Sequence, residues 1–379
     1  EREGWVTYDE IKKKEVGSSS SVSVNTEDPM TINYTSGTTG SPKPVVHKHR
    51  WMAAHNRITG SYWWGVEENV EDELLWATTA PGWAKWYWSP IGVGLTNGLS
   101  QFIYNGTFDA EKYLTLMKKY EVTRLCATPT EYRAFAQLKD LGRYDLKLRA
   151  ALSAGEPLNI DPIRAFRKAF DVEIRDGYGQ TESVCLACNR PGMKIKPGSM
   201  GIPCPGMDIR IVDEQGEVLP EGEVGEISLD PDNPGIFDGY WNSPELDDEV
   251  FGRGLYRTGD LARRDEDGYL WFEGRADDII ISSGYRIGPF EVEDSLVSHP
   301  AVKEAAAVGK PDEERGQIVK AFVVTSAGVA GSTDLIEELQ EFVKGDTAPY
   351  KYPREIEFVK DLPKTKSGKI RRKELRERL

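Results

Sequence analysis

The chain has 379 residues, of which 39% are hydrophobic and 29% charged, and its formal net charge is −14. This length predicts two or three domains, and the acidic charge argues against a general nucleic-acid-binding protein, because phosphate backbones require a basic face. No apolar run is long enough to cross a bilayer, and four cysteines in so long a chain do not make a disulfide framework, which favours a reducing compartment such as the cytoplasm.

A phosphate-binding loop is predicted at residues 34–43, which read YTSGTTGSPK. The loop follows a short β-like run at 30–34 and precedes a helix expected from about His49. Glycines bring backbone N–H groups to an anion, hydroxyls donate to phosphate oxygens, and a lysine adds positive charge. The candidate phosphate ligands are Thr35, Ser36, Gly37, Thr38, Thr39, Gly40 and Lys43. The spacing of a Walker A loop is absent, and in isolation such a loop would be interpreted as a surface turn.

Helix-like runs alternate with short apolar strands from residue 26 to about residue 176, which predicts an α/β fold with a mainly parallel sheet. The strands of this part are expected at 122–127, 149–154 and 171–175. A β-rich stretch follows from Gly198, with strands expected at 207–212, 223–229, 254–262 and 269–273 and a hairpin turn at 213–216.

The pattern resets to a smaller α+β unit near the end of the chain. Its helices are expected near 289–298 and 333–344, and its strands at 302–308 and 319–325. We therefore place a boundary at about Asp277, which divides the chain into a large domain over 1–276 and a small C-terminal domain over 277–379.

Two glycine-containing turns directly follow predicted strands, at 155–157 and at 176–183. Ligands of open α/β sheets gather beyond the carboxyl ends of the strands, so both turns are expected to contact one nucleotide. Tyr178 offers a ring face to a purine, Thr181 offers a hydroxyl to phosphate, and Glu182 can hold a hard cation. The candidate nucleotide residues in these turns are Gly155, Glu156, Pro157, Asp176, Gly177, Tyr178, Gly179, Gln180 and Thr181. Each turn alone is weak support, since Tyr178 could be core and Glu182 a surface acid.

Further candidates lie later in the chain. Asp260 ends a predicted strand and could accept hydrogen bonds from both ribose hydroxyls, although a hairpin turn also explains it. Arg275 and Arg286 are candidates for charge-assisted contacts with phosphate or ribose. The last twenty residues hold nine Lys or Arg against three Asp or Glu. This excess either solvates a terminal helix or meets a polyanion, and the sequence TKSGK favours a loop that presents Lys369.

Cys185 and Cys188 form a C-x-x-C pair. Because a second pair or a nearby histidine is missing from the sequence around it, we interpret these residues as buried thiols rather than a zinc or redox site.

In order and identity, these residues resemble the core motifs of the adenylate-forming superfamily, over about residues 30 to 379. Segments 274–289 (GRADDIIISSGYRIGP) and 347–354 (TAPYKYPR) resemble medium-chain acyl-CoA synthetases. The resemblance implies that a carboxylate attacks the α-phosphorus of Mg-ATP and gives an acyl-adenylate. The small domain then rotates about a hinge at Asp277, and the thiol of CoA attacks the acyl carbon.

The resemblance also implies individual roles. Lys369 would contact the carboxylate and the α-phosphate, with Thr181 and Glu182 completing the catalytic set and Glu182 holding Mg²⁺ through phosphate or water. The implied CoA-binding residues are Ser283, Gly284, Tyr285, Arg315, Tyr352, Pro353 and Arg354. His299 falls in a segment that binds a cation in some relatives, and a capped helix end explains it equally well.

The acyl pocket is implied by Trp83, which matches a pocket tryptophan, and by Gly179, where acetyl-specific relatives carry a tryptophan. An acid longer than acetate is therefore expected, whether medium-chain, branched or aryl. Relatives also carry a substantial region before the phosphate loop, so we expect this chain to lack part of the large domain. The alternatives are a carrier-type adenylation domain and a non-catalytic nucleotide-binding fragment. The oligomeric state stays open.

Overall fold

The computed structural model describes residues 10, 12–13, 21–35, 42–66, 70–79, 81–155, 158, 160–364 and 370–379. In these ranges the strands form four sheets, of two, four, five and seven strands. Within the same ranges, no helix combines the length and the apolar character needed to cross a bilayer.

The seven-stranded sheet is the centre of the large domain. Its order is β4 (Ser100–Gln101), β3 (Leu74–Ala77), β5 (Arg124–Ala127), β6 (Ala150–Ala154), β7 (Ile174–Gly179), β8 (Cys185–Cys188) and β9 (Ile202–Pro203). The first five run parallel, β8 pairs antiparallel with β7, and β9 pairs antiparallel with β8. This confirms the predicted α/β fold with a mainly parallel sheet. The strand expected at 171–175 lies instead at Ile174–Gly179, because its later residues, 177–179, pair with β8.

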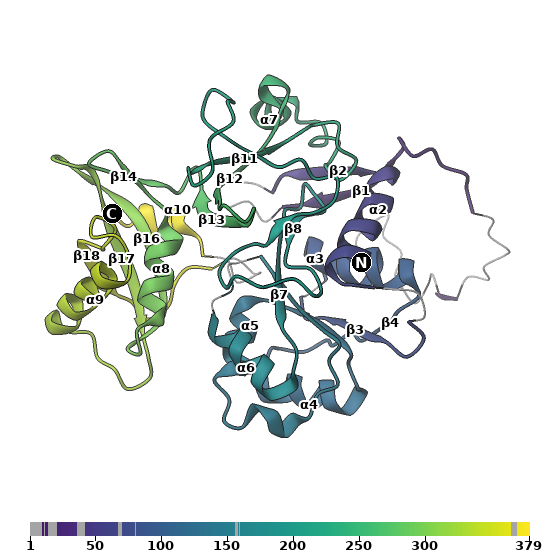
Figure 1. Ribbon diagram of the computed structural model, residues 1–379, viewed down its shortest axis with the longest axis horizontal. Coiled ribbons are helices and arrows are strands. Elements are labelled where there is room, and N and C mark those ends of the chain that lie inside the picture. Colours follow the sequence, from purple (N-terminus) through teal and green to yellow (C-terminus); the bar gives the residue numbers. More distant parts are fainter. Residues whose placement is uncertain are drawn as a thin grey trace.

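Helices cover both faces of this sheet, as parallel strands require. They are α2 (His49–His55), η1 (Asn56–Trp63), α3 (Ala84–Trp86), η2 (Tyr87–Gly94), η3 (Leu95–Asn97), α4 (Ala110–Tyr120), α5 (Pro129–Ala136), η4 (Leu141–Tyr144) and α6 (Ile160–Phe170). Figure 1 shows α4, α5 and α6 gathered on one side of the sheet. There Leu125 packs with Phe135 and Phe166, while the next residue, Cys126, faces the cluster that contains Trp51 and Trp63.

The start of α5 shows why a helix follows β5 at once. Thr128 accepts a hydrogen bond from the backbone N–H of Glu131, and the Glu131 carboxylate accepts one from the backbone N–H of Thr128. Pro129 occupies the first turn, where no hydrogen-bond donor is needed. The chain therefore turns sharply at the carboxyl end of β5.

A two-stranded hairpin carries the two ends of the predicted phosphate loop. Strand β1 (Pro29–Tyr34) pairs antiparallel with β2 (Pro44–Lys48), and α2 begins at His49. The predicted strand before the loop and the helix after it are both confirmed.

A four-stranded antiparallel sheet follows in the order β10 (Arg210–Val212), β11 (Gly225–Leu229), β12 (Tyr256–Arg264) and β13 (Leu270–Arg275). Between β11 and β12 lie α7 (Pro244–Val250) and η5 (Gly252–Gly254). The chain turns at 213–216 as expected, but the predicted hairpin is reduced to a single β-bridge between Val212 and Val218. The strand that pairs with β10 is β11, which begins later, at Gly225.

The C-terminal elements form a separate sheet of β14 (Ile280–Ser282), β15 (Tyr285–Ile287), β16 (Val302–Asp312), β17 (Gly316–Thr325) and β18 (Glu355–Phe358). The helices are α8 (Pro289–Ser298), α9 (Thr333–Asp346) and α10 (Arg372–Arg376). Figure 1 shows this yellow-green part to one side of the molecule. Both predicted helices and the two long strands are confirmed. The short strands β14, β15 and β18 were not predicted, because three or four residues carry little periodicity.

Candidate active site

The carboxylate of Asp260 is the centre of a hydrogen-bond network at the carboxyl end of β7 in the large sheet. Its Oδ2 accepts from the hydroxyl of Tyr178 at 2.6 Å and from Nε2 of Gln180 at 2.5 Å, and its Oδ1 accepts from Nη1 of Arg275 at 3.1 Å. The residue is 5% exposed. Four sequence-predicted nucleotide residues therefore meet at one point: Tyr178 on β7, Gln180 just after it, Asp260 on β12 and Arg275 on β13.

This network leaves little spare capacity on Asp260. A carboxylate offers about four acceptor positions, and three are used here. If both hydroxyls of a ribose bind, Tyr178 or Gln180 must release Oδ2. The arrangement is therefore a preorganised acceptor held by donors that a ligand can replace.

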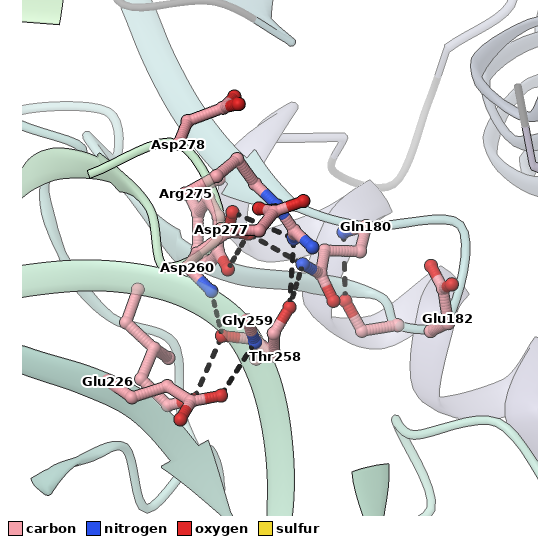
Figure 2. Close-up of polar contacts among 12 residues, drawn as sticks. Gln180, Glu182, Glu226, Thr258, Gly259, Asp260, Arg275, Asp277 and Asp278 are labelled. Atoms are coloured by element: carbon pink, nitrogen blue, oxygen red, sulfur yellow. Dashed lines mark hydrogen bonds and ion pairs between the residues drawn. The ribbon is translucent and has the colours of Figure 1, made fainter. Parts of the chain in front are cut away.

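A second layer of contacts supports the network (Figure 2). The carbonyl of Thr258 accepts from Gln180 Nε2 at 2.8 Å and from Arg275 Nη1 at 3.0 Å. The hydroxyl of Tyr256 donates to Gln180 Oε1 at 2.6 Å. Burial alone would lower the pKa of Arg275, but the carboxylates of Asp260 and Asp277 outweigh it and raise that pKa. The guanidinium thus stays charged beside Asp260.

Tyr178 and Asp176, both on β7, have different hydrogen-bond partners. Burial, strengthened by the neighbouring Asp260 charge, raises the pKa of Tyr178 well above its usual value, so it stays a neutral donor. Burial also raises the pKa of Asp176 strongly, and its Oδ1 accepts from the N–H of Gly177 at 3.0 Å. Asp176 therefore shapes the turn from within, whereas the Tyr178 hydroxyl takes part in the network.

Glu182 lies in the turn after β7, beside the end of the phosphate loop. Its Oε1 accepts from the hydroxyl of Tyr240 at 2.9 Å, and burial raises the pKa of its carboxyl group. The ammonium of Lys43 lies 5.3 Å from the centre of the Tyr240 ring. The backbone N–H of Thr35 donates to the carbonyl of Lys43 at 3.0 Å, which closes the neck of the loop. Thus Tyr240 links the predicted cation ligand to the loop.

Of the predicted phosphate-loop residues, Ser36, Gly37, Thr38, Thr39 and Gly40 lie outside the described residues, as do Glu156, Pro157 and Lys369. Gly155 is described and follows β6 directly. The carboxyl ends of β6 and β7 are neighbours, with Ala154 paired to Gly177. The two predicted turns therefore leave the sheet side by side, as the rule for open sheets requires.

His47 supports the Thr181–Glu182 turn through a hydrogen bond to its backbone. Its Nε2–H donates to the carbonyl of Thr181 at 2.8 Å, and its ring lies 4.2 Å from that of Trp51, which stacks on His55. Burial lowers the pKa of both histidines to about 4. Both rings are therefore neutral in the folded protein near pH 7.

We expect the free energy of unfolding to fall as the pH drops from about 6.5 to about 4. Between these pH values His47 and His55 bind protons in the unfolded chain but stay neutral in the folded one. This difference lowers the free energy of unfolding by about 3 kcal/mol per ring. Above pH 6.5 this stabilisation is fully present. Urea unfolding at pH 7 and pH 4.5 measures the loss, which His47→Gln should roughly halve. The control His49→Gln changes a half-buried ring and should keep the full loss; a pH-independent wild type would contradict the expectation.

Gly179 has a structural role in addition to the one implied by the resemblance. A Cβ at this position would lie 2.5 Å from the carbonyl oxygen of Val184 and 3.3 Å from Cα of Cys185. Any side chain there must displace backbone atoms. Replacing Gly179 by tryptophan would therefore test backbone tolerance as much as pocket length. Trp83, the other predicted pocket residue, is half-buried at the start of α3.

The predicted CoA residues lie on the C-terminal sheet and gather in two places. Arg315 donates to Oγ of Ser283 at 3.1 Å, and Ser283 and Gly284 form the turn between β14 and β15. The ring of Tyr285 stacks on that of Tyr350 at 4.2 Å. The second group contains Tyr352, Pro353 and Arg354, in which Arg354 Nη1 donates to the Tyr352 hydroxyl at 2.7 Å.

Two candidates, Arg286 and His299, lie apart from the Asp260 network, and a third, Asp277, contacts it only through Arg275. Arg286 is exposed and pairs with Glu214 at 3.1 Å. His299 contacts Glu338 through Nε2 at 3.3 Å and accepts from the N–H of Ala301 through Nδ1, so the capped-helix explanation suffices for it. Asp277, the predicted hinge, is exposed and accepts from Arg275 Nε at 3.3 Å.

Sequence reasoning missed several residues of this region. Lys85 donates to the carbonyls of Ala127 at 3.4 Å and Ala154 at 3.1 Å, which places a cation at the carboxyl ends of β5 and β6. Tyr240 and Tyr256 were also missed. Tyr240 comes from a segment outside the motifs, whereas Tyr256 lies on β12 with Asp260; in both cases a lone tyrosine gives no signal that separates a site from the core.

Two family models match the chain. The model described as "AMP-binding enzyme" matches residues 1–241, and the one described as "AMP-binding enzyme C-terminal domain" matches residues 291–369.

Curated proteins resemble the chain over almost its whole length. The uncharacterized acyl-CoA ligase YtcI of Bacillus subtilis (strain 168) is 52% identical over 99% of this chain and 70% of its own length. The mitochondrial acyl-coenzyme A synthetase ACSM3 of Homo sapiens is 42% identical over 100% of this chain and 65% of its own length. This chain thus spans about two thirds of the curated relatives.

Two solved structures share the architecture. The anthranilate CoA ligase AuaEII in complex with anthranoyl-AMP matches with a TM-score of 0.86 and 33% identity, over 95% of this chain and 69% of that one. A benzoate CoA ligase from Burkholderia xenovorans LB400 matches with a TM-score of 0.82 and 33% identity, over 93% of this chain and 69% of that one.

Proposed function

The chain belongs to the family of AMP-binding enzymes, and from this premise we propose that it is an ATP-dependent, AMP-forming acid–thiol ligase that makes acyl-CoA. The observation that carries the proposal is the meeting of Tyr178, Gln180 and Arg275 on the carboxylate of Asp260. These residues come from motifs far apart in the sequence, and their meeting supports a single nucleotide site.

In the first half-reaction, a carboxylate oxygen of the acid attacks the α-phosphorus of ATP. The new acyl–phosphate bond forms as the bond to the β-phosphate breaks, and pyrophosphate leaves. A carboxylate is already nucleophilic at neutral pH, so alignment and charge neutralisation matter more than a base. We assign Asp260 to the ribose, the turns at 155–157 and 176–180 to adenine, and the loop at 35–43 to the β- and γ-phosphates.

Lys369 would neutralise charge on the α-phosphate and the acid, with Thr181 as a hydroxyl donor. The half-buried carboxylate of Glu182 suits Mg²⁺, because this ion prefers oxygen ligands and binds through one or two carboxylates with water and phosphate. Mg²⁺ would supply charge neutralisation between the phosphates. Tyr240 would orient Glu182 through its 2.9 Å hydrogen bond.

In the second half-reaction, the sulfur of CoA attacks the acyl carbon, and AMP leaves as the carbon–oxygen bond breaks. We propose that residues 277–379 move as a small domain about Asp277, so that Lys369 gives way to the CoA-binding residues. The change of sheet between β13, which ends at Arg275, and β14, which begins at Ile280, supports a hinge there. Arg286, which pairs with Glu214 in this arrangement, would contact the nucleotide in another.

We propose an acid longer than acetate as the substrate, whether medium-chain, branched or aryl. Two relatives whose names specify an acid, anthranilate and benzoate, act on aryl acids. Each buried methylene contributes only about 0.8 kcal/mol, so selectivity among similar acids should be broad. A reducing compartment such as the cytoplasm suits the four free cysteines.

Pyrophosphate release, measured with a panel of acids with and without CoA, tests the proposal. An acyl-CoA ligase should need CoA for turnover and should release AMP and acyl-CoA in equal amounts. Release that is independent of CoA, with an acyl-adenylate trapped by hydroxylamine, would indicate a carrier-type adenylation domain instead. If the protein binds ATP but releases no pyrophosphate with any acid, it is a non-catalytic nucleotide-binding fragment.

A further inference from the structure

Three of the four cysteines form a buried cluster on β8 and at the end of β9, the two strands that follow β7 in the large sheet. Cys185 and Cys188 lie on β8, and Cys204 follows β9; they are 6%, 0% and 2% exposed. Their three sulfur atoms all lie within 4.8 Å of one another, and the Sγ atoms of Cys188 and Cys204 are 3.5 Å apart. The sequence showed only the C-x-x-C pair. The sulfur of Cys204 comes close to it only because β9 pairs with β8.

The backbone holds these sulfur atoms in place. The N–H of Cys204 donates to the carbonyl of Leu186 at 2.8 Å. Gly201 has φ +85°, and a Cβ on it would lie 2.0 Å from the carbonyl carbon of Cys188, so only glycine allows β9 to approach β8 this closely. The cluster is thus built by the fold and does not depend on flexible side chains.

The separations suit a thiolate-bound metal better than a disulfide. Zinc–sulfur bonds of about 2.3 Å in a tetrahedron place sulfur atoms roughly 3.8 Å apart. The observed separations of 3.5 Å and at most 4.8 Å need shifts of about 1 Å or less to reach that value. A disulfide between Cys188 and Cys204 would need the sulfur atoms to close to about 2.0 Å.

The charge around the cluster points to a divalent ion. Arg175 is 8% exposed, and its Nη2 donates to the carbonyls of Trp63 and Trp64, at 3.1 and 3.3 Å. In the described part of the chain, none of its hydrogen bonds goes to a carboxylate, and its Nε has no partner. A buried cation needs a compensating anion. Gly177 lies opposite Cys188 on β8, so Arg175, two residues earlier on the same face, is its diagonal neighbour.

We infer that Cys185, Cys188 and Cys204 bind one Zn²⁺ ion through their three thiolates. Binding releases three protons, and three thiolates with one divalent cation carry a net charge of −1, which the guanidinium of Arg175 balances. A monovalent ion would leave −2 and a trivalent ion 0, and neither matches a single buried arginine. A water molecule would complete the tetrahedron, as it does in other sites with three protein ligands. This site is independent of the acyl-CoA ligase activity.

Metal analysis of the protein tests this inference. The chain is produced in zinc-supplemented medium and dialysed against EDTA, and its zinc is counted by mass spectrometry. We expect about one zinc per chain in the wild type and at least about tenfold less in Cys188→Ser and Cys204→Ser. Cys126→Ser is the matched control, because Cys126 is also buried and free but lies outside the cluster, and it should keep the ion.

Zinc-edge X-ray absorption on the wild type needs no variant and covers the case in which a variant fails to fold. It should show three sulfur neighbours at about 2.3 Å. Zinc far below one per chain in the wild type, or zinc surrounded only by nitrogen and oxygen, would overturn the inference. Equal loss of zinc from Cys126→Ser, or a Cys188–Cys204 disulfide found by peptide mass mapping of the native protein, would also overturn it.

Discussion

Replacing Lys369 by alanine is expected to slow acyl-adenylate formation by about 100-fold or more, since removal of one donor from a developing charge costs about that much. In the proposed mechanism the lysine acts only in the first half-reaction. Formation of the thioester from preformed acyl-adenylate should therefore stay within about twofold of the wild-type rate. Single-turnover measurement of each half-reaction separates the two effects.

Lys366→Ala is the matched control, because it removes the same charge from the same TKSGK segment. It should leave adenylate formation within about threefold of the wild type, because the proposed mechanism gives Lys366 no contact with the acid or the α-phosphate. If Lys369→Ala slows both half-reactions equally, or if Lys366→Ala is as slow in the first, the role given to Lys369 is wrong.

Replacing Asp260 by asparagine should raise the KM for ATP by about 10- to 100-fold. Hydrogen bonds to a charged acceptor contribute about 1.5–3 kcal/mol each, and asparagine offers one neutral oxygen in place of two charged ones. The change also leaves the guanidinium of Arg275 without the carboxylate 3.1 Å away. Initial rates over a range of ATP concentrations, with the acid and CoA saturating, measure the effect.

The control Asp267→Asn changes an aspartate in the exposed turn between β12 and β13, where it pairs with Lys196. It should leave the KM for ATP unchanged, since surface ion pairs contribute about 1 kcal/mol or less and this one lies outside the Asp260 network. Thermal denaturation of both variants shows whether they are folded. A KM for ATP in folded Asp260→Asn that matches the control would exclude Asp260 from the nucleotide site.

The outline of the fold could be predicted because local patterns carry it. Apolar runs indicated β5 and β6, the helix-like runs that alternate with such strands indicated the α/β layers, and α8 was predicted with its observed bounds. The candidate site could be approached for a related reason. Close contact between backbone and phosphate, or a carboxylate at a strand end, needs particular residue types in a short stretch, and a short stretch is visible in sequence.

The side chains that complete these motifs could not be predicted, because they come from other parts of the folded chain. Tyr240 and Tyr256 contact Glu182 and Gln180 from segments 58 and 76 residues away, and no local pattern records such a separation. Cys204 joins the C-x-x-C pair because β9 lies against β8, and the carbonyl of Val184, just before β8, leaves no room for a side chain on Gly179. The elements and the chemistry at their ends were predictable from local sequence, since both depend on neighbours along the chain. Partners across strands depend on register and packing, which exist only once the sheet has formed.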